Sequence, residues 1–140
     1  MKTKAIIFSL GLIVSINTFY SQEEEHPIDI ELRDCLSLDS NMTTYGMMEC
    51  EGIARDAWEK EMNKYYDILL SILTPEQQEK LKLSQQKWIE FKDYEISLSN
   101  QIYYDMQGTM WRPVAISNQA SIFRSRAFEL ISYYENLTME

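Results

Sequence analysis

Apolar residues recur at intervals of three and four positions over three long stretches of this sequence, and this periodicity constrains the fold more than any other feature. Such spacing places the apolar side chains on one face of an α-helix. We find no convincing run of alternating apolar and polar residues of the kind that forms a strand. The sequence therefore predicts an all-α protein whose long helices pack through these faces.

Capping residues indicate where the three helices begin and end. The first is expected to begin near residues 41–44, where Asn and Thr suit the N-cap. The second begins at the segment T-P-E-Q of residues 74–77, which supplies a cap, a first-turn proline and a capping-box glutamine, and it ends before Gly108. The third covers residues 114–137, so the short connections predict an antiparallel bundle of three long helices. The predicted core residues of the three helices are Ala54, Trp58, Met62, Tyr65, Leu69 and Ile72; Leu81, Ser84, Trp88, Phe91, Glu95, Leu98 and Ile102; and Ile116, Ala120, Phe123, Ala127, Leu130, Tyr134 and Leu137.

The first 21 residues have the layout of a secretory signal peptide: two lysines, an apolar run over residues 5–16, and a short polar end. The run is shorter than the roughly 20 residues of a membrane-spanning helix, although an uncleaved anchor is the alternative. Residues 22–40 are polar and contain Pro27, so we expect an extended leader there. Residues 41–140 then form the helical domain.

The two cysteines, Cys35 and Cys50, are close in sequence in a chain that we expect to be exported. An even number of cysteines in an oxidising compartment predicts one disulfide, which would link the leader covalently to the first helix. Metal binding is the weaker interpretation, because the only histidine, His26, lies in the acidic leader. Acidic pairs such as Glu49 and Glu51 are expected to be solvated rather than to hold calcium. We predict no metal and no cofactor.

The formal net charge is −9, and removal of the signal peptide would take away two lysines and no acid. Such a chain repels phosphate backbones, which argues against nucleic-acid binding. A cationic protein is the favoured partner, although the same charge also serves simply to keep an exported protein soluble.

Motifs of common catalytic sites are missing from the sequence. A single histidine argues against a histidine-activated nucleophile, and no glycine-rich phosphate loop is present. Paired carboxylates could cleave glycosides, but a chance pair is expected among 22 acids. We therefore predict no catalytic residues and no enzymatic activity.

Asn63 is an unusual residue within the first predicted helix, because its amide competes for backbone hydrogen bonds. If the turn at residues 74–77 makes an antiparallel hairpin, Asn63 lies opposite Gln85, and Glu59 lies opposite Lys92. A paired, mostly buried amide set would fix the register of the hairpin. A polar pocket wall is the alternative.

Three motifs of these helices occur in a recognisable order. They are Glu59-x-x-Met62-Asn63-x-x-Tyr66, Leu81-x-x-x-Gln85-x-x-Trp88-x-x-x-Lys92-Asp93 and Arg126-Ala127-x-Glu129-Leu130. With Cys50 ahead of them, they resemble the motifs of the LprI-like domain family, which is named for a mycobacterial lysozyme inhibitor. The resemblance covers roughly residues 35–135.

The resemblance implies a small helical protein of the bacterial envelope, periplasmic or secreted. The sequence differs from the family pattern at Glu59, Met62 and Lys92. At Lys92 the point charge of a lysine replaces the forked guanidinium of an arginine. Ile96 stands where relatives often carry a further cysteine. The candidate site residues are Glu59, Asn63, Tyr66, Gln85, Trp88, Lys92 and Asp93, with Arg126 and Glu129 in the third helix.

Two functions are consistent with these observations. The first is a protein-binding module for a cationic partner, with a lysozyme suggested by the resemblance and with surface tyrosines supplying contact area. The second is a structural or small-ligand-sensing module, in which Asn63, Gln85 and Lys92 line a pocket.

Overall fold

The computed structural model describes residues 25–139, and these residues form helices without a strand. The all-α prediction is confirmed for this part of the chain, whereas the predicted signal peptide lies outside it. No helix among these residues is long and apolar enough to cross a membrane. The elements are α1 (Pro27–Ser37), the 3-10 helix η1 (Asp39–Asn41), α2 (Thr44–Ile72), α3 (Pro75–Asp105) and α4 (Trp111–Thr138).

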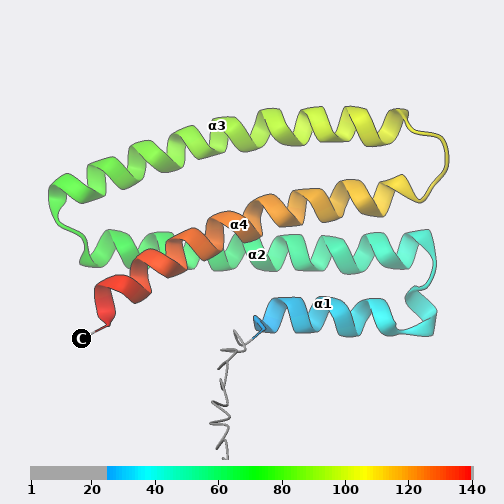
Figure 1. Cartoon of the computed structure of the whole chain (residues 1–140), viewed down its shortest axis with the longest axis horizontal. Helices are drawn as coiled ribbons and strands as arrows, with labels where there is room; N and C mark the ends of the chain where they lie inside the picture. The colour runs from blue at the N-terminus through cyan, green and yellow to red at the C-terminus, as the bar shows by residue number, and fades with distance from the viewer. Residues whose placement is uncertain (1–24, 140) are drawn as a thin grey trace, which may run out of the picture.

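The segment predicted as an extended leader contains helix α1, so the described residues form four α-helices rather than three. Pro27 occupies the first turn of α1, and the His26 side chain caps the helix by accepting the Ile28 backbone N–H at 3.3 Å. Proline favours a helix start, because the N–H that it lacks has no partner in the first turn. The prediction of an extended segment around Pro27 is therefore wrong. Helix α1 lies alongside α2 (Figure 1).

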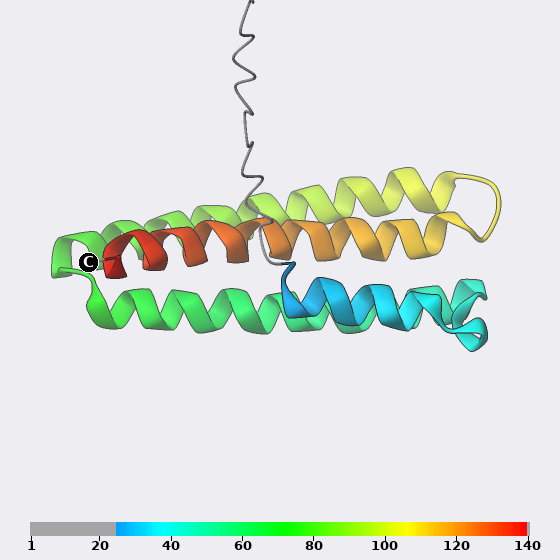
Figure 2. The same cartoon turned by 60° about the horizontal axis from the view of Figure 1, so that its bottom comes forward.

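Helix α4, rather than α3, is the main packing partner of α2. Helices α2 and α3 run in opposite directions from the predicted capping box, in which Gln77 N donates to Thr74 Oγ1 at 3.4 Å. Beyond that turn α4 runs between them, and the turned view shows α4 beside α3 and above α2 (Figures 1 and 2). Small buried residues of α4, including Ala115 and Ala127, let α2 approach closely.

The core lies where α2, α4 and the first half of α3 meet. The predicted stripes of α2 and α4 supply most of it. On α3 the predicted core stripe is largely wrong. Leu81 is buried as predicted, but Phe91, Leu98 and Ile102 are exposed. The core residues are Trp58, Met62, Leu69, Leu81, Phe123, Ala127 and Leu130.

The predicted disulfide between Cys35 and Cys50 is confirmed, and it joins α1 to α2. Asn41 lines the corner between these helices and donates from Nδ2 to the Cys35 carbonyl at 2.9 Å. Gly46 allows this approach, because a Cβ there would lie 2.5 Å from the Cα of Asn41. Closing such a loop stabilises the fold by about 3 kcal/mol in the chain-entropy estimate.

Candidate functional site

Arg126 of α4 lies almost completely buried, with 4% of its surface exposed, where α4 meets α3. Its Nε donates to Gln85 Oε1 at 3.0 Å, and its Nη2 donates to Ser84 Oγ at 3.3 Å. A buried guanidinium is costly unless it has such partners. Arg126 therefore ties α4 to α3 at one register.

The contacts of Arg126 extend in both directions. Its Nη1 pairs with Glu129 Oε2 at 2.5 Å, and Glu129 Oε1 accepts the Tyr133 hydroxyl at 3.0 Å. That hydrogen bond to the carboxylate, together with its negative charge, raises the pKa of Tyr133. On the other side, Gln85 Nε2 donates to Met62 Sδ at 3.7 Å. We call this set the Arg126 network; its members are Met62, Ser84, Gln85, Arg126, Glu129 and Tyr133.

Trp88 and Lys92 follow Gln85 on the same face of α3, and both are half-buried against α4. The Trp88 ring meets the Phe123 ring edge-on with centroids 5.8 Å apart. Lys92 Nζ lies 5.5 Å from the centroid of the Phe123 ring and 2.8 Å from Asp93 Oδ1. These residues therefore hold α3 to α4 and do not pair with α2.

The proposed hairpin lock between Asn63 and Gln85 is wrong. Asn63 and Glu59 are exposed on α2, whereas the Gln85 amide is buried and bonds to Met62 and Arg126. The reason is the position of α4, which runs between α2 and α3 and occupies the place of the predicted direct hairpin contact.

The structure brings together residues of all three motifs, and the second and third are joined through Gln85, Arg126 and Glu129. From the first motif, Met62 joins this network and Tyr66 is half-buried beside the core. Sequence reasoning missed Ser84 as a polar partner, having assigned it to the apolar stripe, and missed Tyr133. Ser84 is adjacent to Gln85, and Tyr133 lies one helical turn after Glu129. These positions could have indicated both residues as polar partners.

A groove of about 440 Å³ borders the Arg126 network. Four of its nine lining residues are leucines, and Ser84 and Tyr133 belong both to the groove and to the network. Its exposed surface is mainly apolar with several polar side chains, which suits a largely apolar ligand that carries a polar group. The lining residues are Leu69, Leu73, Gln77, Lys80, Leu81, Ser84, Tyr133, Asn136 and Leu137.

The sequence matches the family described as lysozyme inhibitor LprI over residues 35–130, which includes all three motifs. The chain belongs to the LprI family. Its structure is similar to the crystal structure of an uncharacterised protein from Burkholderia thailandensis, with a TM-score of 0.71 and 27% sequence identity. The match covers 76% of this chain and 53% of that one, so the chain spans about half the length of its structural relative. No curated protein matches.

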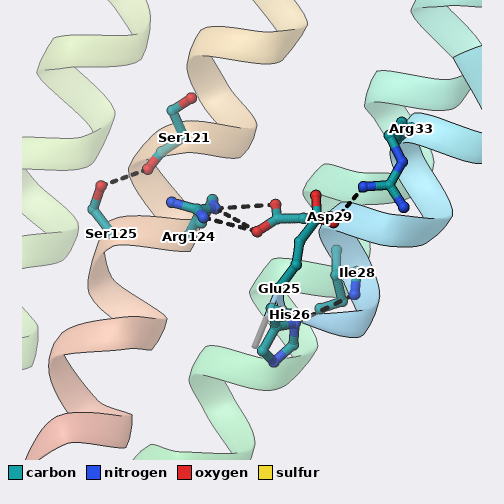
Figure 3. A network of polar contacts seen from close by, with 8 residues as sticks. All are labelled: Glu25, His26, Ile28, Asp29, Arg33, Ser121, Arg124 and Ser125. Carbon is teal, nitrogen blue, oxygen red and sulfur yellow. Dashed lines mark hydrogen bonds and ion pairs between the residues drawn. The ribbon is translucent and has the colours of Figure 1, made fainter. Parts of the chain in front are cut away.

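A second polar cluster of this LprI-family protein joins α1 to α4. Figure 3 shows the Arg124 guanidinium directed at the Asp29 carboxylate, with N–O distances of 2.7, 3.0 and 3.1 Å. These hydrogen bonds raise the pKa of Arg124. The same guanidinium lies 4.6 Å from the centroid of the Phe128 ring. The cluster anchors the first helix.

His26 belongs to this cluster rather than to an extended leader. Its ring lies against Trp58 with centroids 4.4 Å apart, and its Nε2 is 3.9 Å from Glu61 Oε1. Its other ring nitrogen caps α1. Within residues 25–139, no group of three His, Cys, Asp or Glu side chains is placed to hold a metal ion.

Proposed function

We propose that this protein is an exported LprI-type module that binds a cationic protein in the bacterial envelope, with a lysozyme as its partner. Family membership carries this proposal, because the matched residues 35–130 belong to a family described as a lysozyme inhibitor. Inhibition by occupation of an enzyme's surface needs no catalytic group, which accords with the missing catalytic motifs.

The charge and the disulfide support the proposal. A net charge of −9 attracts a cationic protein and accelerates its encounter with the chain. The disulfide between Cys35 and Cys50 suits an oxidising compartment such as the periplasm or the exterior of the cell. Both features agree with export and with a partner that acts outside the cytoplasm.

A lysis assay tests this function directly. The purified protein is added to several lysozyme types at low and at physiological salt, and lysis of a peptidoglycan substrate is followed. We expect protection at low salt that weakens as the Debye length falls from about 30 Å at 0.01 M to about 8 Å at 0.15 M. A complete lack of protection at low salt, against every lysozyme, would refute the inhibitor function.

The groove beside the Arg126 network favours a second candidate function, the binding of a small apolar ligand with one polar end. A lipophilic fluorescent probe tests it in the wild-type protein and in Leu137→Glu, which places a charge on the groove wall. We expect probe fluorescence to rise with the wild-type protein and to fall in the variant. Equal fluorescence in both proteins would exclude the groove as the site.

A further inference from the structure

The outer face of the second half of α3 carries four exposed apolar residues in one helical stripe. Their exposed fractions are 56% for Phe91, 80% for Tyr94, 53% for Leu98 and 46% for Ile102. Intervals of three and four residues place them on one side of the helix. These four side chains are exposed within residues 25–139, and α3 contacts α4 through other residues, including Gln85 and Asn100. A contiguous exposed patch of this kind indicates an interaction site.

Negative charge is concentrated around the same stripe. Residues 89–105 contain four carboxylates and one lysine, and that lysine, Lys92, is already paired with Asp93 at 2.8 Å. The first half of α3, residues 75–88, contains two carboxylates and three lysines. Glu90 is likewise paired, with Lys87 of the first half at 2.9 Å. The acids that adjoin the stripe at helical spacing are Glu95, four residues after Phe91, and Asp105, three residues after Ile102. The apolar stripe therefore has an acidic rim formed by Glu95 and Asp105.

We infer that this outer face of α3, defined by Phe91, Tyr94, Leu98 and Ile102 and called the α3 surface below, is where the cationic protein partner docks. The inference rests on the proposed function and names its binding surface. Aromatic side chains supply the core contact of the interface, and the acidic rim pairs with basic residues of the partner. The stripe is about 16 Å long, which suits the central part of a protein interface.

Charge also argues against other occupants of the α3 surface. A second copy would bring the same acidic rim against itself, and like charges across an interface are unfavourable. An anionic lipid surface would repel the rim as well. The groove is lined by residues from the first half of α3, including Leu81 and Ser84, so it does not include the α3 surface.

The double variant Tyr94→Ala with Leu98→Ser tests the α3 surface. Its matched control is Tyr45→Ala with Leu38→Ser, because Tyr45 is 76% exposed and Leu38 is 54% exposed, close to the values of 80% and 53% for Tyr94 and Leu98. Binding to lysozyme is measured at low salt for both variants and for the wild-type protein. We expect the dissociation constant to rise about tenfold or more in the α3 variant and to stay within about twofold in the control.

Each other outcome overturns the assignment. If the wild-type protein binds lysozyme and the α3 variant binds equally well, or if both variants lose affinity equally, the docking surface lies elsewhere. If the wild-type protein binds no lysozyme, the proposed function fails and the α3 surface loses its partner. If sedimentation shows a wild-type dimer that the α3 variant separates, a second copy occupies the surface instead. Equal unfolding midpoints of the three proteins confirm that folding is unchanged.

Discussion

The two faces of α3 depart from the usual distribution of polar and apolar residues on a helix, because each mixes the two kinds. The inner face buries Gln85 and Ser99, whereas the outer face exposes Phe91 and Tyr94. The buried amide is satisfied by Arg126, and Asn100 of α3 accepts a further hydrogen bond from Gln119 of α4 at 3.0 Å. The polar inner face thus specifies how α3 sits on α4, and the apolar outer face is left for a partner.

Removal of Arg126 is expected to have the largest effect on the free energy of unfolding. Arg126→Ala leaves the Gln85 amide without its partner and opens a cavity, which costs about 3 kcal/mol. The control is Arg124→Ala, whose side chain is 46% exposed in its ion pair, so its loss costs about 1 kcal/mol or less. Urea unfolding of both variants measures the difference. Equal losses would mean that the inner face of α3 does not hold the fold together.

Glu51 of α2 is a buried polar residue that can be compared with the buried, hydrogen-bonded Gln85 of α3. Its residue is 9% exposed, and its Oε2 has no hydrogen-bond partner within residues 25–139. Burial raises the pKa of Glu51 above its ordinary value of 4.5, while the Ser117 hydroxyl opposes the shift. The folded state therefore holds the proton more tightly than the unfolded chain, so stability is lost as pH rises from about 4.5 through the raised pKa.

The variant Glu51→Gln removes this titration. At pH 7 we expect it to be more stable than the wild-type protein by up to about 1 kcal/mol, a gain of a few degrees in melting temperature. The gain should shrink as the pH is lowered toward 4.5. Thermal unfolding of both proteins between pH 4 and pH 8 measures it. A gain that does not vary with pH would show that ionisation of Glu51 is not the cause.

Substitutions on the outer face of α3 are expected to have the smallest effect on stability. Phe91→Ser and Ile102→Ser should each change the free energy of unfolding by no more than about 0.5 kcal/mol, because both side chains are already exposed. Leu81→Ala on the inner face of the same helix, at 7% exposure, should cost about 2 to 3 kcal/mol. Comparable losses at the three positions would show that the outer face is packed.

Hydrophobic periodicity predicted α2 and α4 well because their buried residues are apolar, as Trp58, Leu69, Phe123 and Leu130 illustrate. The same rule selected the wrong face of α3, because the residues that this helix buries include polar ones with specific partners. The sequence carries no periodic signal for such a face. A partner such as Arg126, which lies 41 positions from Gln85, is found only when the helices are arranged in space.

The candidate site shows the same limit. The motifs of the second and third stretches named Gln85, Arg126 and Glu129 as candidate residues, and the structure joins Gln85 to Arg126 and Arg126 to Glu129. Their pairing was not predictable, because the turn at residues 74–77 fixes the directions of α2 and α3 and leaves the position of α4 open. Helix α1 was missed for a local reason: a first-turn proline capped by His26 starts a helix.

Hydroxyl-radical footprinting of the wild-type protein, alone and with lysozyme, tests the central claim most directly. Tyr94 and Tyr45 serve as internal reporters, since both are highly exposed in the free protein. We predict that labelling of Phe91 and Tyr94 falls several-fold on binding while labelling of Tyr45 is unchanged. Protection of Tyr45 with unchanged labelling of Phe91 and Tyr94 would contradict the account, because the partner would then bind away from the outer face of α3.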